Sequence, residues 1–274
     1  MLFENDKPVI GVIHLLPLPG APAYAGNVRD IKDRALKQAG IYQQEGLDGV
    51  IVENFGDAPF FKNGVPPETT ACLTAVLSEI ANEVDIPYGV NVLRNDALSA
   101  LGIACATGAS FIRVNVHSHA VITDQGMIEG DAARTLRKRR ELGADIQIWA
   151  DVWVKHAAPL ADIGLEDEVR DVQERGMADA VIVTGGYTGA GADLSQLEHV
   201  KSVARRPVYI GSGMAAENLS EYYGLADGFI VGSAFKMDGE ACNDVDAEKV
   251  KNFMERYCEL RNTVRGTQNK KEVK

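Results

Sequence analysis

The chain has 274 residues, of which 46% are hydrophobic and 24% charged, and its formal net charge is −11. This length is common for one large α/β domain. The acidic excess argues against a protein that binds nucleic acid or anionic membranes through general charge attraction. No apolar run reaches the roughly 20 residues that span a bilayer, and the first residues lack a signal-peptide pattern. We therefore predict a cytoplasmic protein without a transmembrane segment, which leaves peripheral membrane association open.

Short runs rich in β-branched residues alternate with amphipathic helical patterns along the whole chain. Strands are predicted at 9–14, 49–54, 88–93, 110–116, 146–154, 180–184, 208–211 and 228–231. Helices are predicted at 28–45, 70–84, 97–107, 131–142, 165–175, 194–204, 216–223 and 247–261. Eight strands in strict alternation with eight helices predict a parallel sheet that closes into a (β/α)8 TIM barrel.

No linker or change of composition divides the chain. We therefore predict a single barrel domain over residues 1–263. The polar, basic segment 264–274 is predicted to be a disordered tail, as chain ends often are.

The alternation of side chains along each strand predicts which residues face the barrel lumen. On the fifth strand the apolar set, expected to face the helices, is Ile146, Ile148, Ala150, Val152 and Val154. The opposite set, expected to face the lumen, is Gln147, Trp149, Asp151, Trp153 and Lys155. A lumen with this polar filling indicates a site at the mouth of the barrel.

The other strands also send polar side chains inward or end on them. The residues concerned are His14, Glu53, Asn91, Arg113, Asn115, His117 and Thr184. Barrel enzymes keep their sites at the C-terminal ends of the strands. His156, next to Lys155 at the end of the fifth strand, is a further candidate.

Two glycine-serine turns follow the seventh and eighth strands, at Gly211-Ser212-Gly213 and Gly232-Ser233. Glycine lets the backbone approach a ligand closely, and free N–H groups at such turns favour an anion. In a TIM barrel these two positions are a common phosphate site. The glycine-rich loop that begins with Gly185 and Gly186 predicts a lid or a second anion cradle.

Several alternatives remain open. Glu53 with Arg113, and Asp151 with Lys155, are also compatible with structural ion pairs, because buried charges need partners. Otherwise Asp151 or Glu53 acts as general acid or base, and Lys155 as a phosphate clamp or Schiff-base amine.

The histidines leave further alternatives. His14 either faces the ligand or hydrogen-bonds to its own loop. His117 and His119 have ligand-like spacing, and with Glu53 and Asp151 they could form a metal site. The sequence requires no cofactor. It is also compatible with a bound divalent metal.

Many of these residues lie in stretches that resemble the BtpA family of BtpA/SgcQ-like TIM-barrel proteins. The stretches are Gly11-Val-Ile-His-Leu-Leu-Pro-Leu-Pro-Gly20, Val52-Glu-Asn-Phe-Gly-Asp-Ala-Pro-Phe60, Gly89-Val-Asn-Val-Leu-Arg-Asn-Asp96, Phe111-Ile-Arg-Val-Asn115, Ala150-Asp-Val-Trp-Val-Lys-His156, Thr184-Gly-Gly-Tyr-Thr-Gly189, Gly211-Ser-Gly213 and Val231-Gly-Ser-Ala-Phe-Lys236. The resemblance runs from residue 8 to about residue 240. It implies a TIM barrel, and it implies either a role in photosystem I biogenesis or, as for members beside sugar-transport genes, a nucleosidase activity.

We expect the barrel to bind a small phosphorylated sugar or nucleoside-like molecule and to hydrolyse a glycosidic bond. The expected catalytic residues are Asp151, Glu53, Lys155 and His14. The expected substrate-binding residues are Asn91, Arg113, Asn115, His156 and Thr184, and the phosphate-binding residues are Gly185, Gly186, Gly211, Ser212, Gly213, Gly232 and Ser233. The alternatives are a biogenesis factor without catalysis and a sugar-phosphate isomerase or aldolase that uses Lys155. A homo-oligomer is also expected.

Overall fold

A computed structural model describes residues 2–154, 156–185 and 193–272, with residues 265–272 described in backbone only. Eight parallel strands close into a barrel in the order β1-β11-β10-β9-β7-β4-β3-β2. They are β1 (Val9–His14), β2 (Gly49–Glu53), β3 (Tyr88–Asn91), β4 (Phe111–Val114), β7 (Gln147–Val152), β9 (Ala180–Val183), β10 (Val208–Ile210) and β11 (Gly228–Val231). The prediction of a (β/α)8 barrel is confirmed.

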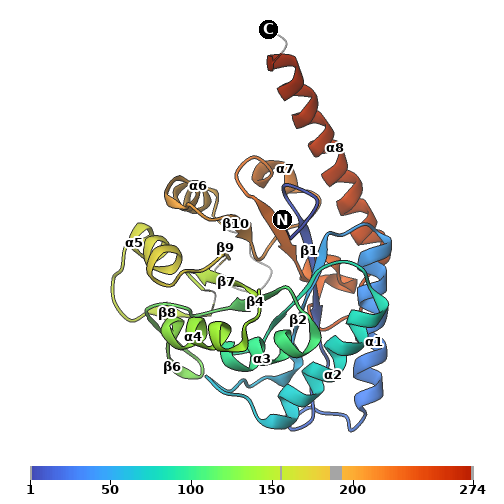
Figure 1. The fold of residues 1–274 in the computed structure, drawn as a ribbon. Helices are drawn as coiled ribbons and strands as arrows, with labels where there is room; N and C mark the ends of the chain where they lie inside the picture. Colours follow the sequence, from blue (N-terminus) through green and yellow to red (C-terminus); the bar gives the residue numbers. More distant parts are fainter. Residues whose placement is uncertain (1, 155, 186–192, 273–274) are drawn as a thin grey trace.

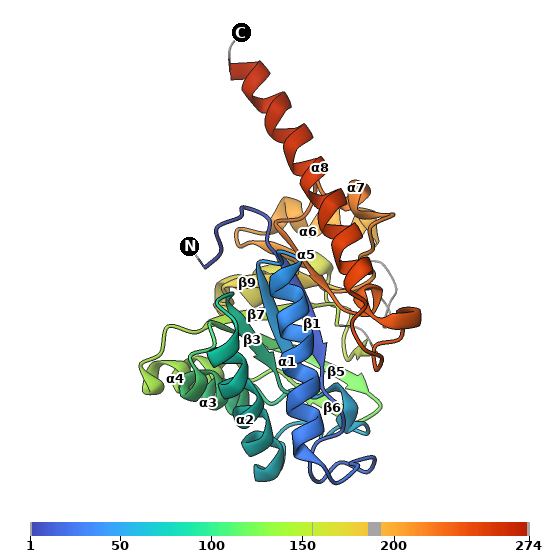
Figure 2. The same ribbon diagram turned by 90° about the vertical axis from the view of Figure 1, so that its right-hand side faces the viewer.

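Helices surround the strands on the outside of the barrel (Figures 1 and 2). They are α1 (Val28–Gln44), α2 (Pro67–Glu83), α3 (Ala97–Thr107), α4 (Ala132–Leu142), α5 (Leu165–Arg170), α6 (Leu194–Val203), α7 (Leu219–Tyr222) and α8 (Ala247–Glu272). Polar side chains cap several helix starts, as for Asp96, whose carboxylate accepts from the backbone N–H of Ser99.

The barrel has two apolar layers. One lies between the strands and the helices and contains the helix-facing residues predicted on β7, among them Ile148 and Ala150. The other fills the lower lumen, where the Trp149 ring stacks between Phe111 and Tyr209, with ring centroids 3.9 and 4.4 Å apart. This aromatic stack closes the lumen below the polar mouth.

Most of the barrel strands end one or two residues earlier than predicted, and for two of them this changes where side chains point. Strand β4 ends at Val114 and β7 at Val152, so the alternation rule no longer applies to the residues that follow. Trp153 was predicted to face the lumen, but its side chain is 45% exposed and its φ is +50°. His117 was also predicted to face inward, but its Nε2 contacts the carbonyl oxygen of Gly176 at 2.8 Å.

A three-stranded antiparallel sheet outside the barrel was not predicted. It consists of β5 (Ala120–Thr123), β6 (Gly126–Glu129) and β8 (Ala158–Pro159), in the order β6-β5-β8. The strands lie in the loops that follow β4 and β7. They therefore join two neighbouring loops at the mouth of the barrel.

Helix α8 is longer than predicted. Its backbone continues to Glu272, and its C-terminal part projects away from the barrel in both views (Figures 1 and 2). Helix α8 therefore extends into the segment predicted as a disordered tail, and the disorder of that segment stays a prediction. Within the described part of the chain, no helix is both long enough and apolar enough to cross a membrane.

Candidate active site at the barrel mouth

Two cavities open at the C-terminal ends of the barrel strands, and they share the side chains of Glu53 and Arg113. The first, of about 230 Å³, is lined by Val12, His14, Glu53, Arg113, Gly211, Ser212, Gly213, Met214, Ala215, Gly232, Ser233, Ala234 and Gly239. The second, of about 360 Å³, is lined by Glu53, Phe55, Phe60, Asn91, Leu93, Arg94, Arg113, Asn115, Asp124 and His156. The two shared side chains therefore lie between the cavities.

Arg113 is the centre of a buried ion cluster. Its Nε and Nη2 donate to the two oxygens of Asp151 at 2.9 and 3.0 Å, and its Nη1 donates to Oε1 of Glu53 at 3.2 Å. Burial lowers the pKa of the Arg113 guanidinium, but the carboxylates of Asp151 and Glu53 outweigh this and hold that pKa above its usual value. Arg113 is therefore a fixed positive charge. The structure forms the Glu53–Arg113 ion pair, which the sequence left open as an alternative to a functional role.

Asp151 is enclosed by this cluster. Besides the two contacts to Arg113, its Oδ2 accepts from Nδ2 of Asn115 at 2.9 Å, and its side chain has no exposed surface. It lines neither cavity. The structure brings Asp151 next to Arg113, while Lys155, its alternative partner, lies outside the described residues.

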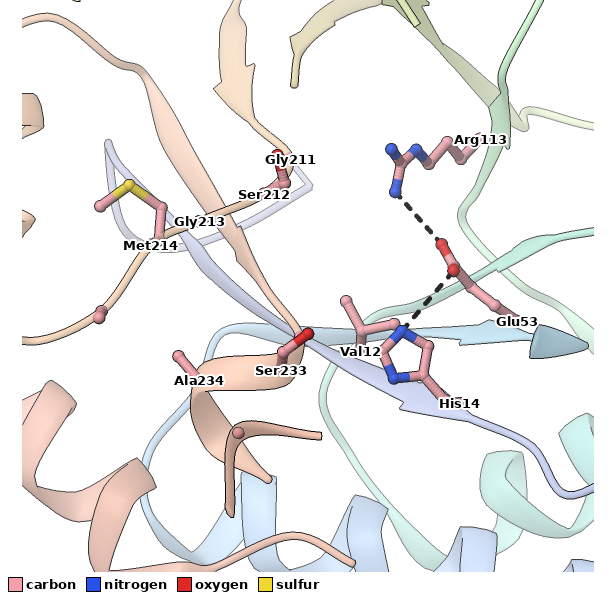
Figure 3. A pocket seen from close by; sticks show the side chains of 13 residues that line it. Val12, His14, Glu53, Arg113, Gly211, Ser212, Gly213, Met214, Ser233 and Ala234 are labelled. Carbon is pink, nitrogen blue, oxygen red and sulfur yellow. Dashed lines mark hydrogen bonds and ion pairs between the residues drawn. The ribbon is translucent and has the colours of Figure 1, made fainter. Parts of the chain in front are cut away.

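Glu53 is the carboxylate that both cavities reach. Its Oε1 is held by Arg113, while its Oε2 lies 3.9 Å from Nε2 of His14 (Figure 3). Nδ1 of His14 lies 3.0 Å from the carbonyl oxygen of Ala241, in the segment after β11. His14 therefore lines the first cavity and faces Glu53, and its contact with a ligand stays a prediction.

The loop after β2 holds Glu53 in place. The side chain of Asn54 accepts from the backbone N–H of Leu93 at 2.7 Å and donates to Asp57 at 3.0 Å. The other oxygen of Asp57 accepts from the N–H of Leu18 at 2.8 Å. These bonds tie the loops after β1, β2 and β3 together, so the residues flanking Glu53 are positioning residues.

The two glycine-serine turns line one wall of the first cavity; we call residues 211–215 and 232–234 the anion cradle. A Cβ at Gly211 would lie 2.5 Å from Cγ2 of Ile182, and Gly213 has a φ of +69°, so both positions favour glycine. The backbone N–H groups of Gly213 and Met214 donate to no acceptor among the described residues. Both residues line the first cavity.

The loop after β9 contributes less than predicted in the part that is described. The Oγ1 of Thr184 lies 3.5 Å from the carbonyl oxygen of Trp153, and Thr184 lines neither cavity. The N–H of Gly185 donates to Oγ of Ser212 at 2.7 Å, which links this loop to the anion cradle. Gly186 lies outside the described residues, so its predicted role is not addressed by the structure.

The predicted histidine metal site is not assembled. Nε2 of His119 lies 3.2 Å from Oδ2 of Asp171, on the outer side of the barrel, and burial lowers the pKa of His117. Within the parts of the chain that are described, no group of three or more His, Cys, Asp or Glu side chains is arranged to hold a metal ion. His117 and His119 therefore do not join Glu53 and Asp151.

Phe55, Phe60, Leu93 and Arg94 line the second cavity and were not predicted as site residues. They follow strands β2 and β3 at the end of the barrel where sites are expected. Their position directly after these strands was the sequence signal that could have identified them. Strand alternation missed them because they lie in loops.

Comparison with known proteins gave consistent matches over nearly the whole chain. The model of the BtpA family matches residues 5–259. The photosystem I biogenesis protein BtpA of Synechocystis sp. is 45% identical, over 94% of this chain and 90% of its own length. An uncharacterised protein of Pyrococcus furiosus is 46% identical, over 90% of this chain and 93% of its own.

Solved structures share the fold at much lower identity. Thiamine phosphate pyrophosphorylase from Pyrococcus furiosus superposes with a TM-score of 0.58 at 14% identity, over 93% of this chain and 96% of that one. This likeness supports the barrel fold alone.

Proposed function

The chain belongs to the BtpA family, and from that premise we propose that its barrel mouth binds a phosphorylated sugar or nucleoside-like molecule and hydrolyses a glycosidic bond in it. The observation that carries the proposal is the position of Glu53. This carboxylate lies between the anion cradle and the second cavity and lines both. A ligand with its phosphate in the cradle would place its sugar beside Glu53.

The phosphate would bind to backbone N–H groups of the cradle, supported by the hydroxyl groups of Ser212 and Ser233. In this arrangement the phosphate would be bound by a glycine backbone and not by a cluster of lysine side chains. The Arg113 guanidinium lies close to Gly211, but Asp151 and Glu53 already balance its charge, so the proposed phosphate site relies on the backbone of the cradle.

Glu53 would act on the glycosidic bond. As a general base it would take a proton from water, whose oxygen bonds to the sugar carbon. The bond to the leaving group breaks and its electron pair stays with the leaving group, which takes up a proton from solvent, while Glu53 later releases its own proton to solvent. The carboxylate would also stabilise the positive charge that develops on the sugar ring.

The sequence-based prediction that Asp151 supplies this chemistry stays a prediction. Both of its oxygens are occupied by hydrogen bonds and it has no exposed surface. Our proposal therefore gives the reacting role to Glu53, and treats Asp151 as the residue that positions Arg113. An isomerase or aldolase that uses Lys155 likewise stays a prediction.

Ligand-induced stabilisation tests the proposal. We expect inorganic phosphate and ribose 5-phosphate to raise the unfolding temperature, by several degrees at a ligand concentration of about 100 times Kd, where stabilisation reaches ~2.7 kcal/mol. Ser212→Asp should abolish this shift, because it adds a negative charge at the cradle. Ser202→Asp, the same change at an exposed position on α6, should keep it. The proposal fails if no phosphorylated compound stabilises the wild type, or if Ser212→Asp responds normally.

A second function is supported by one observation. The outer face of the three-stranded sheet exposes Ile122, Met127 and Leu160, whose exposed fractions are 44%, 41% and 56%. Exposed apolar side chains that cluster in this way are typical of protein contact surfaces. Together with the name of the Synechocystis relative, they favour a role in assembling a protein complex. A wild type that responds to no small ligand would favour this function.

A further inference from the structure

The second cavity has aromatic walls. Phe55 lies in the turn after β2, Phe60 lies in the same loop, and His156 follows β7 on the other side. The Phe55 ring also contacts the ring of His14, with centroids 4.6 Å apart, so it stands between the two cavities. Flat side chains around a cavity of about 360 Å³ suit a flat ligand group.

Asn91 lines this cavity, and its buried side chain contains an acceptor without a partner among the described residues. Its side chain is 99% buried, and its Nδ2 donates to the carbonyl oxygen of Arg113 at 3.0 Å and to Oδ1 of Asn115 at 3.1 Å. These bonds fix the orientation of the amide. Its Oδ1 has no hydrogen-bond partner among the described residues. A buried acceptor without a partner is costly, and a ligand N–H group would remove that cost.

We infer that the second cavity binds a planar ring that carries an N–H donor and is joined to the sugar. The inference rests on the proposed function, because it takes the phosphate of the same molecule to lie in the anion cradle. Glu53 and Arg113 line both cavities, so the sugar and its bond to the ring lie beside the Glu53 carboxylate. The ring is then the leaving group, and the substrate class is a ring-sugar-phosphate rather than a free sugar phosphate.

Calorimetric titration separates the two cavities. The probes are ribose 5-phosphate, adenosine, and three nucleotides whose rings carry an N–H donor: AMP, UMP and nicotinamide mononucleotide. We expect at least one nucleotide to bind the wild type tenfold or more tightly than ribose 5-phosphate does. Phe60→Leu should weaken that nucleotide about tenfold, because stacking on one aromatic side chain is worth about 1–3 kcal/mol. It should change the affinity for ribose 5-phosphate less than about twofold.

Phe61→Leu is the matched control, since Phe61 is the neighbouring residue, is 58% exposed and does not line the cavity. It should leave all affinities unchanged. Phe55→Leu gives the same test at the other wall should Phe60→Leu fail to fold.

The outcomes distinguish the two proposals. Nucleotides that bind no more tightly than ribose 5-phosphate, or equal losses in Phe60→Leu and Phe61→Leu, would overturn the ring inference while the phosphate site stands. Adenosine binding that depends on Phe60, without any response to ribose 5-phosphate, would overturn the phosphate site and keep the ring site. No binding of any probe would overturn both.

Discussion

Arg113 binds two carboxylates at the barrel mouth, Asp151 and Glu53, and these lie in different environments. Asp151 receives two of its N–H groups and is fully enclosed, whereas Glu53 receives one and keeps an oxygen toward His14. A buried ion pair is stable only when both partners are well hydrogen-bonded. Asp151 therefore positions the guanidinium of Arg113, and this guanidinium in turn holds Glu53 at the edge of the two cavities.

Lys236 is fully buried and lies outside the site. Its Nζ donates to Oε1 of Gln38 at 2.6 Å and lies 5.8 Å from the centroid of the Tyr42 ring. Burial, and then the charge of Arg34, lowers the pKa of Lys236 from 10.5 to about 7. Between these two values the folded protein holds Lys236 neutral, whereas the unfolded chain binds a proton there.

This difference predicts a pH-dependent stability. Because the unfolded state binds more protons, the contribution of Lys236 to the free energy of unfolding rises as the pH increases from about 7 toward 10.5. Below about pH 7 Lys236 is protonated in both the folded and the unfolded state, so the folded protein bears the full free-energy cost of burying this charge. Urea unfolding of wild type and Lys236→Met across this range measures how their free energies of unfolding differ. The free energy of the variant relative to that of the wild type should fall by a few kcal/mol as the pH rises, because only the wild type gains stability.

Lys251→Met, at an exposed position on α8, is the control and should show a difference from wild type that does not vary with pH. A Lys236→Met difference that is equally flat from pH 7 to 10 would contradict the assigned pKa shift.

At the scale of elements, the ends of the strands decide which residues reach the site. The turn Phe55–Asp57 packs directly on the loop after β1, and a Cβ at Gly56 would lie 2.5 Å from the backbone nitrogen of Pro17. Backbone atoms cannot shift aside as the end of a flexible side chain can. Gly56 therefore sets the distance between two loops that carry site residues.

A pair of glycine substitutions tests this contact. Gly56→Ala should destabilise the protein by about 1–3 kcal/mol, because it overpacks against the backbone of the neighbouring loop. Gly40→Ala, in the interior of α1 with open space around the new Cβ, should stabilise it by about 0.5–1 kcal/mol. Chemical unfolding measures both. A Gly56→Ala protein as stable as wild type would show that the loops can separate freely.

At the scale of the whole molecule, α8 combines an anchored part with a projecting part. Phe253 and Tyr257 are buried against the barrel, and Nη1 of Arg261 donates to Oδ1 of Asn5 at 2.8 Å. Beyond this point the helix leaves the barrel (Figure 2). The stability of the barrel should therefore depend on α8 only as far as about Arg261.

Truncation tests this division. A chain that ends at Val264 should unfold within about 1 °C of the full chain, since it keeps every buried side chain of α8 that the structure describes. A chain that ends before Phe253 should lose several kcal/mol, because deletion of large buried aromatic side chains costs about 3–5 kcal/mol each. Differential scanning calorimetry compares the three. A large loss on removing only residues 265–274 would place the domain boundary later than predicted.

Much of the fold could be predicted from the sequence because its signals are local. The eight barrel strands coincide with the predicted runs to within a few residues, and the inward direction of Glu53 and Arg113 followed from alternation along a strand. The sheet of β5, β6 and β8 was missed because its strands lie within the loops after β4 and β7, outside the strand–helix alternation that located barrel strands of similar length. Such short runs inside loops lack a periodic pattern.

The sequence by itself determined the closed barrel, the glycine turns after β10 and β11, and the types of polar group available at the mouth. Tertiary structure alone decided how these groups share their hydrogen bonds. The position of Asp151 in the sequence cannot show that Arg113 and Asn115 occupy both of its oxygens, nor that Glu53 lies between two cavities. The physical reason is that periodicity sets the direction of a side chain within its own strand. Burial and partners depend on residues from β2, β4 and β7, which meet only when the barrel closes.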